Sequence, residues 1–148
     1  MTSQFVNETT FKRENENKWI GNLDENWNIA GIPNGGYLLA VVLRAMQEQA
    51  ELKNLLSVNA HYLRPGVTGE EAIVESMTLR KGSTVSTSSA SLKQREKLSL
   101  QVLAAFGEFK KTDDSFPKVE LEPPDIPSPE NCEKRSAENQ GVDLSIQK

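Results

Sequence analysis

The longest apolar stretch of the chain lies in its first third, directly after a pair of glycines, Gly35-Gly36. The apolar residues that follow recur at three- and four-residue spacing, which is typical of an α-helix. They are Tyr37, Leu38, Leu39, Val42, Leu43 and Met46, with Ala40, Val41 and Ala45 filling much of the remaining circumference. A helix that is apolar nearly all round is normally buried, and the unbroken run over 37–43 is far too short to span a bilayer. The pattern predicts one central helix over residues 36–50, covered by other elements.

Four segments after this helix read as strands, because their apolar and polar positions alternate or because small β-forming residues predominate. They cover residues 55–63, 70–80, 84–94 and 97–109, with turns at 81–83 and 95–96. In the first strand Leu56, Val58, Ala60 and Tyr62 face one way, and Ser57, Asn59 and His61 face the other. Two shorter extended pieces, 18–21 and 27–29, precede the helix. We therefore predict an α+β fold in which one antiparallel sheet wraps around the central helix.

The chain has 148 residues, a length and composition that suggest a single domain. We place it at residues 1–111, and we interpret the proline-rich, acidic segment 112–148 as a linker or extension that adds little to the core. The net charge of −4 gives no support for a nucleic-acid-binding surface. With Cys132 as the one cysteine and His61 as the one histidine, neither an internal disulfide nor a multi-histidine metal site is expected. The polar first 17 residues lack the apolar core of a signal peptide, so we expect a cytoplasmic or organelle-matrix protein.

The entry to the helix is the strongest candidate for chemistry. The N–H groups of the first helical turn have no partner inside the helix, and the dipole makes this end positive. The N–H groups of Gly35, Gly36 and Tyr37 are therefore candidates to bind an anion or to polarise a carbonyl. Two simpler interpretations stay open: the glycines serve only close packing, and Asn34 caps the helix rather than contacting a substrate.

Four segments together resemble a known family. They are Pro33-Asn-Gly-Gly-Tyr-Leu-Leu39, Ser57-Val-Asn-Ala-His-Tyr-Leu-Arg-Pro-Gly66, Leu79-Arg-Lys-Gly-Ser-Thr-Val-Ser-Thr87 and Ala104-Ala-Phe-Gly107. Their order and spacing resemble the thioesterase-like superfamily of acyl-CoA thioesterases, the double-hotdog type related to bacterial thioesterase II. The resemblance covers about residues 19–109 and concerns the first of the family's two hotdog halves. It implies the hotdog fold, a sheet curled around one helix.

The resemblance also implies an activity, the hydrolysis of an acyl-CoA thioester by water, with no metal or prosthetic group. The candidate catalytic residues are Gly35, Gly36, Ser57, Asn59 and His61, and the candidate substrate-binding residues are Asn34, Tyr37 and Arg64. For His61, which has no acidic neighbour in the sequence, a hydrogen-bonded structural role is favoured over that of a base. For Arg64, pairing with a carboxylate is as well supported as binding a phosphate of coenzyme A. The helper threonine and glutamine of the thioesterase II pattern belong to the second half of that family and have no counterpart here.

One departure from the family limits this expectation. The thioesterase II pattern places its catalytic aspartate on the second half, seven residues before the arginine of a His-Arg-Pro motif, and the same count from Arg64 gives Ser57. A non-catalytic half that serves as scaffold or acyl-binding module is therefore the main rival, and a hotdog hydratase is a weaker one. Either way we expect a homodimer or pairing with a second hotdog, and the small side chains of strand 84–92 suit such close contact.

Overall fold

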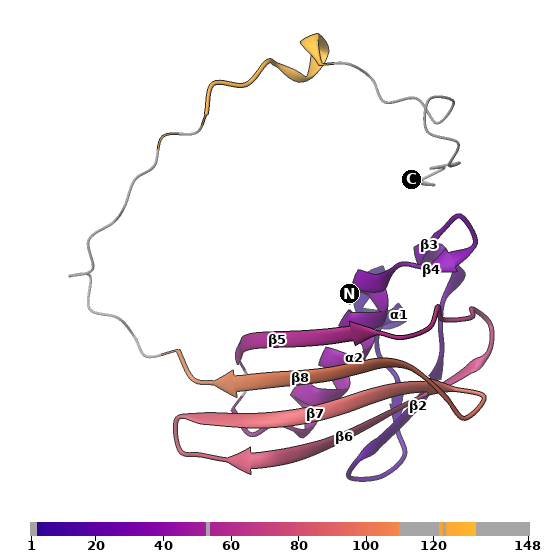
Figure 1. Ribbon diagram of the computed structural model, residues 1–148, viewed down its shortest axis with the longest axis vertical. Helices are drawn as coiled ribbons and strands as arrows, with labels where there is room; N and C mark the ends of the chain where they lie inside the picture. The colour runs from indigo at the N-terminus through magenta and orange to yellow at the C-terminus, as the bar shows by residue number, and fades with distance from the viewer. Residues whose placement is uncertain (1–2, 53, 110–121, 123, 133–148) are drawn as a thin grey trace.

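The computed structural model describes residues 3–52, 54–109, 122 and 124–132. Its main feature is an antiparallel sheet of six strands in the order β1-β2-β6-β7-β8-β5 (Figure 1). These strands are β1 Lys12–Arg13, β2 Lys18–Asn22, β5 Asn54–Tyr62, β6 Glu71–Lys81, β7 Val85–Gln94 and β8 Lys97–Gly107. A separate hairpin of β3 Asn28–Ile29 and β4 Ile32–Pro33 leads into the helix. The helical segments are α1 Gln4–Glu8, α2 Gly35–Gln49, η1 Glu25–Trp27 and η2 Pro129–Asn131.

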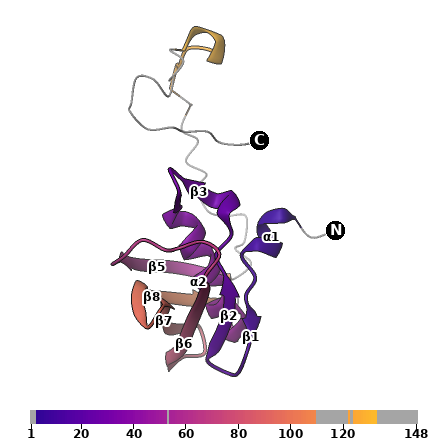
Figure 2. The same ribbon diagram turned by 90° about the vertical axis from the view of Figure 1, so that its right-hand side faces the viewer.

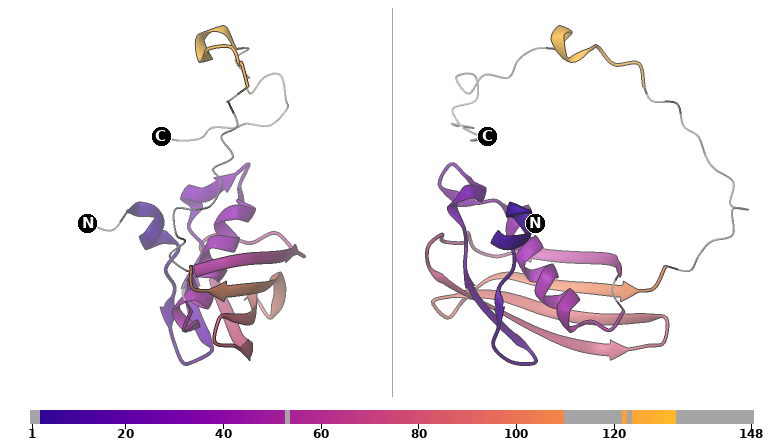
Figure 3. Two further views of the ribbon diagram at one scale, coloured as in Figure 1. Left: turned by 90° about the vertical axis from the view of Figure 1, so that its left-hand side faces the viewer. Right: turned by 180° about the vertical axis from the view of Figure 1, so that it is seen from behind.

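Helix α2 crosses one face of this sheet, as the view from behind shows (Figure 3, right), and the sheet curls around it (Figure 2). The residues buried between them come from α2 and from alternate positions of the strands. They include Leu38, Val41, Val42, Ala45 and Met46 of the helix, and Trp19, Val74, Leu92, Leu100, Val102 and Phe106 of the sheet. Alternation along each strand thus supplies the apolar face that the helix covers.

The fold predicted from the sequence is confirmed: one antiparallel sheet and one long helix, with element boundaries within about two residues of those expected. The N-terminal segment differs, because it was expected to fray or to form an edge. It contains the short helix α1 as well as the edge strand β1. The proposed domain boundary at residue 111 lies outside the described residues.

The serine-rich strand β7 lies inside the sheet rather than at its edge, with β6 on one side and β8 on the other. Its helix-facing residues Ser86, Ser88 and Ala90 are buried under α2. Small side chains here let the helix approach the sheet closely, so this strand serves packing within the chain. It is therefore not an edge of the sheet, and the expected contact of strand 84–92 with a partner stays a prediction.

The two edges of the sheet are the two-residue strand β1 and β5, the nine-residue strand that follows α2. The register of β5 with β8 places Val58, Ala60 and Tyr62 opposite Ala104, Val102 and Leu100, so these residues lie on the helix side as predicted. The helix covers these side chains only in part: Val58 is 40% exposed and Tyr62 is 51% exposed. A long edge strand with exposed apolar side chains is a common site of strand pairing.

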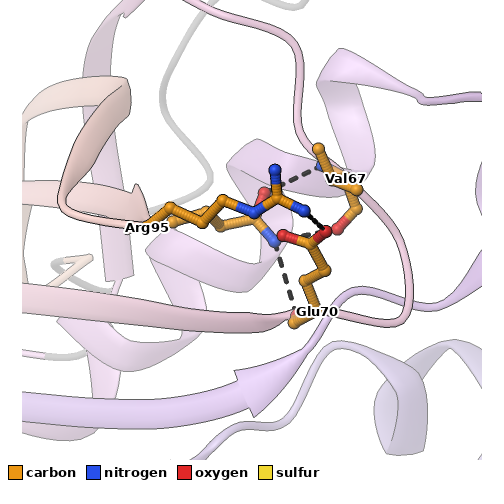
Figure 4. Close-up of polar contacts among 4 residues, drawn as sticks. Val67, Glu70 and Arg95 are labelled. Carbon is orange, nitrogen blue, oxygen red and sulfur yellow. Dashed lines mark hydrogen bonds and ion pairs between the residues drawn. The ribbon is translucent and has the colours of Figure 1, made fainter.

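At the C-terminal end of β7, the side chain of Gln94 holds the loop that follows β5 through hydrogen bonds to Val67. Figure 4 shows Val67, Glu70 and Arg95 of this region. Gln94 is buried; its Nε2 donates to the carbonyl of Val67 at 2.8 Å, and its Oε1 accepts from the N–H of Val67 at 2.8 Å. Arg95 forms an ion pair with Glu70 beside it. Together these contacts hold the loop over residues 63–70 against the β7–β8 turn.

The β7–β8 turn itself stores strain. Arg95 and Glu96 have φ values of 49° and 59°, in the left-handed region that favours glycine. Replacing the exposed Glu96 by glycine is expected to raise the free energy of unfolding by about 0.5–1 kcal/mol, because the strain relieved exceeds the added backbone entropy. Urea unfolding measures the change. As a control, Lys97→Gly, one residue later at the start of β8, should lower stability; a destabilised Glu96→Gly variant would contradict the reasoning.

Candidate active site at the N-terminus of helix α2

Helix α2 begins with a side-chain cap. The Oδ1 atom of Asn34 accepts the N–H of Gly36 at 2.7 Å, and the carbonyl of Asn34 accepts the N–H of Leu38 at 3.1 Å. The backbone of Asn34 is held in turn, because its N–H donates to the carbonyl of Trp27 at 2.9 Å. Asn34 is therefore the cap of the helix, one of the two roles that the sequence left open.

This cap changes which N–H groups are available to a ligand. The Gly36 N–H, expected among the donors, already bonds to Asn34. Within the described part of the chain, the N–H groups of Gly35 and Tyr37 have no acceptor. These two groups, on either side of the capped one, remain as donors at the positive end of a 15-residue helix.

The side chain of Tyr37 points into the protein, away from this end of the helix. Its ring is buried and stacks on Trp27, with 6.0 Å between centroids. Its hydroxyl accepts the N–H of Asp24 and donates to the carbonyl of Glu8, both at 2.9 Å. Burial raises the pKa of this phenol, and the nearby charges of Asp24 and Glu8 raise it further, against the hydrogen bond from Asp24 N–H. Only the backbone of Tyr37 can face a ligand.

Tyr62 covers the first turn of α2 from the end of β5. Its hydroxyl donates to the carbonyl of Gly35 at 3.0 Å. A side chain at position 35 would place its Cβ 3.2 Å from Tyr62 Cε1, so glycine allows the ring to approach. A cavity of about 250 Å³ opens here, and it is lined by Pro33, Gly35, Leu38, Tyr62, Leu63, Arg64 and Pro65.

Arg64 lines the same cavity but does not pair with a carboxylate in the described structure. Its Nη1 donates to the carbonyl of Leu98 at 2.8 Å, and its backbone N–H donates to the carbonyl of Ser99. The exposed guanidinium has five N–H donors in all, so others remain for an anionic ligand. The structure thus brings Arg64 and Gly35 into the lining of one cavity, which Asn34 does not line.

Ser57, Asn59 and His61 lie elsewhere. They pair with Ala105, Leu103 and Gln101 of β8, and they alternate with Val58, Ala60 and Tyr62. Their exposed side chains therefore project from the sheet face opposite α2. The three are neighbours of one another, as predicted, but within this chain they do not face the helix N-terminus. Their catalytic assignment remains a prediction that would need a second hotdog.

Among the residues that the structure describes, none with a carboxylate lines the cavity beside Tyr62. Of the nearby acids, Asp24 accepts the N–H of Asn26 within the short turn before β3. Glu8 is also occupied, because its carboxylate accepts Nε1 of Trp27 at 2.6 Å and Nδ2 of Asn26 at 2.9 Å. Across the described ranges, no group of three or more histidine, cysteine or acidic residues is arranged to bind a metal ion.

Residues 23–107 match a family model, that of the acyl-CoA thioesterase N-terminal domain. The match covers more than half of the chain. This chain belongs to the acyl-CoA thioesterase N-terminal domain family. No curated protein matches the sequence. Within the described residues, no helix is both long and apolar enough to cross a membrane.

Solved structures agree with this family. A candidate thioesterase II from Thermobifida fusca YX is 27% identical, with a TM-score of 0.76, over 88% of this chain and 48% of its own. A conserved hotdog-fold protein from Alicyclobacillus acidocaldarius is 19% identical, with a TM-score of 0.75, and the alignment covers 93% of this chain and 50% of that protein. The tesB protein of Mycobacterium avium subspecies paratuberculosis is 23% identical, with a TM-score of 0.67, over 85% and 48%. The fold is the hotdog fold, and the chain spans about half the length of each of these proteins.

Two parts of the site escaped the sequence analysis. Alternation placed Tyr62 on the helix side, but it gave no sign that its hydroxyl reaches Gly35, 27 residues away. Glu8 lies in a polar segment with no periodic signal, yet it bonds to Trp27 beside the helix entry. The Glu8–Trp27 contact could not be predicted from residue spacing, because the two residues are 19 positions apart and only the folded chain brings them together.

The Glu8 contacts make the N-terminal segment sensitive to pH. Hydrogen bonds, first from Gln4 and also from Asn26 and Trp27, lower the pKa of Glu8 below its ordinary value of about 4.5, against a smaller opposing effect of desolvation. A carboxyl whose pKa is lower in the folded state stabilises the protein above its ordinary pKa, and this stabilisation disappears as the pH falls through the folded value.

We therefore expect the melting temperature to fall between about pH 5 and pH 3 with a contribution from Glu8. In Glu8→Gln that contribution should be absent, so its melting temperature should depend less on pH in this range. Tryptophan fluorescence reports the change directly, because Trp27 loses its carboxylate partner. Identical pH profiles for the two proteins would contradict the expectation.

Proposed function

We propose that this chain is the first hotdog of an acyl-CoA thioester hydrolase and that the substrate carbonyl binds at the N-terminus of α2. The observation that carries the proposal is the pair of N–H groups, Gly35 and Tyr37, that have no acceptor in the described structure; Gly35 also lines the cavity beside Tyr62. Family membership gives the chemistry these groups would serve. The exposed Gly36 leaves the approach to them open.

The reaction places negative charge where these donors point. The oxygen of a water molecule attacks the thioester carbon and loses a proton to a base, and the carbonyl oxygen becomes an oxyanion. N–H donors fixed in advance stabilise that charge, typically by about 3–4 kcal/mol per donor. The carbon–sulfur bond then breaks, which releases the carboxylic acid and the coenzyme A thiol. Arg64 at the cavity rim is suited to hold a phosphate of coenzyme A.

The missing component is the base. No acidic residue of the described ranges lines the cavity, and Ser57 stands where the second-half pattern has aspartate. This favours one alternative: a non-catalytic half that binds or positions an acyl group while a second hotdog supplies the acid. In both cases we propose that the exposed edge of β5 pairs with a second hotdog, either another copy or a second half.

The two possibilities differ in the behaviour of the purified chain. Light scattering gives its size in solution, and release of free thiol from acyl-CoAs of increasing chain length gives its activity. We expect an assembly larger than the monomer, with slow turnover. A stable monomer at micromolar concentration would contradict the pairing, and the absence of both turnover and acyl-CoA binding would contradict the proposed function.

Substitution at Gly36 tests where the carbonyl binds. In Gly36→Val, Cβ would already lie 3.0 Å from Oδ1 of Asn34, and the branched side chain would cover the helix end. We expect turnover to be lost, since one oxyanion donor alone is worth about 10²–10³-fold in rate. His61→Gln, on the opposite sheet face, should change turnover little. The reverse result, loss in His61→Gln with activity kept in Gly36→Val, would overturn these roles.

A further inference from the structure

The first turn of α2 contains two successive glycines, and a pair of glycines has unusual freedom to rotate. Yet the peptide group that joins Gly35 to Gly36 is held at both ends. Its carbonyl oxygen accepts the hydroxyl of Tyr62 at 3.0 Å, and its N–H donates to Oδ1 of Asn34 at 2.7 Å. The two holding residues come from different elements, one from the end of β5 and one from the cap of the helix.

Tyr62 contacts Gly35 through both its hydroxyl and its ring. The hydroxyl is the only polar group of Tyr62, and the ring lies against Gly35, with Cε1, Cζ and Cδ1 at 3.2, 3.5 and 3.7 Å from a hypothetical Cβ. Tyr62 itself is well placed, because its register partner on β8 is the buried Leu100. The end of β5 therefore brings a hydroxyl to the first turn of α2, where two glycines follow one another.

Holding this one peptide plane controls its two neighbours. The Gly35 N–H precedes the held plane and the Tyr37 N–H follows it, and these are the two groups without an acceptor in the described structure. The torsions ψ of Gly35 and φ of Gly36 join the held plane to these neighbours, and a change in either torsion alone would turn the two N–H groups relative to each other. An oxyanion site works only when its donors are fixed before the charge develops.

We propose that Tyr62 is a positioning residue of the active site: its hydroxyl locks the Gly35–Gly36 peptide and so aims the N–H groups of Gly35 and Tyr37 at the substrate carbonyl. This inference rests on the proposed function for the substrate, but the locking itself does not. Tyr62 transfers no proton and forms no bond to the thioester. Its effect is carried entirely by the backbone of the helix entry.

The test removes one oxygen atom. In Tyr62→Phe the ring remains against Gly35 and only the hydrogen bond is lost, so the fold should be kept. Amide hydrogen exchange by NMR is expected to become several-fold faster at Gly36, whose N–H bonds to Asn34, with no change at the β8 amides near Leu100. Thr87→Val, a matched removal of one hydroxyl on the outer face of β7, should leave all of these rates unchanged. Unchanged exchange at Gly36 in Tyr62→Phe would overturn the locking.

A second measurement separates positioning from general support. Where the chain turns over acyl-CoA, kcat should fall about five- to tenfold in Tyr62→Phe with KM nearly unchanged, because the oxyanion rather than the substrate is affected. Asn34→Ala removes the other hold on the same peptide, so the double variant should lose less than the product of the two separate losses. Fully multiplicative losses, or a change confined to KM, would contradict the role.

The proposal also stands apart from the presence of turnover. A ketone analogue of acyl-CoA, with a methylene group in place of the sulfur, binds without reacting. In the unmodified chain it should shift the amide signals of Gly35 and Tyr37, and in Tyr62→Phe these shifts should shrink. Equal shifts in both proteins would overturn the aiming of the donors. Faster exchange in Tyr62→Phe together with no response of either amide to the analogue would instead keep the locking and contradict the proposed function.

Discussion

Replacing Trp19 by alanine is expected to lower the free energy of unfolding by about 3–5 kcal/mol. Trp19 lies on β2 opposite Val74, and none of its surface is exposed. Its Nε1 donates to the carboxylate of Glu48 on α2 at 2.7 Å, so it joins the first full strand to the central helix. The guanidinium of Arg13 covers the ring at 5.2 Å from its centroid. Truncation would leave a large cavity at the centre of the core.

The size of this effect decides whether the domain folds. A single domain is stable by about 5–15 kcal/mol, so the loss would remove much of that margin. Trp19→Phe is the matched control: it keeps an aromatic ring in the core and loses the bond to the exposed Glu48, at a cost of about 1–2 kcal/mol. Urea unfolding of the three proteins measures both values. A loss below 1 kcal/mol in Trp19→Ala would show that Trp19 does not pack in the core.

The central helix and the sheet were predictable because both follow from short-range patterns. The spacing of Leu38, Val42 and Met46 predicts a helix whatever surrounds it. The alternation from Val58 to Tyr62 predicts which side chains of β5 lie on which face of the sheet. The same alternation placed His61 on the other face of the sheet from Tyr62. The sequence therefore already predicted that the His61 side chain points away from α2. What the pattern did not contain was which strands would lie at the edges of the sheet.

The details of the candidate site depend on contacts between distant segments, and these left no trace in spacing. Asn34 was ambiguous between capping and substrate binding, because both roles use the same side-chain oxygen at the same helix end. Tyr37 lies in the first turn of α2, but its hydroxyl bonds to the backbone of Asp24 and Glu8. Asp24 precedes η1 and Glu8 ends α1, so both are distant in the sequence from the helix entry. Residue types identified the helix entry; only the fold decided which N–H groups it leaves open.

The proposed division of labour between two hotdogs leads to the second large effect. Joining this chain to a second hotdog that carries a carboxylate is expected to raise acyl-CoA hydrolysis by about 10²–10⁴-fold, the usual contribution of a general base. Among the described residues, the cavity at the N-terminus of α2 is lined by Gly35, one of the two proposed oxyanion donors, and by no acid that could activate water. The exposed β5 edge provides the place where a second sheet can pair.

The Thermobifida fusca protein offers the partner, because this chain covers 48% of its length and leaves another half. A fusion of this chain to that half, assayed by thiol release, tests the effect. The matched control replaces by asparagine the aspartate that the thioesterase II pattern places seven residues before the arginine of the His-Arg-Pro motif. We expect the rate of the active fusion to fall at low pH as its carboxylate becomes protonated, and the asparagine control to stay slow at every pH. Equal rates for the two fusions would show that the base lies in this chain, and the search for it would return to Ser57, Asn59 and His61 on the outer face of β5.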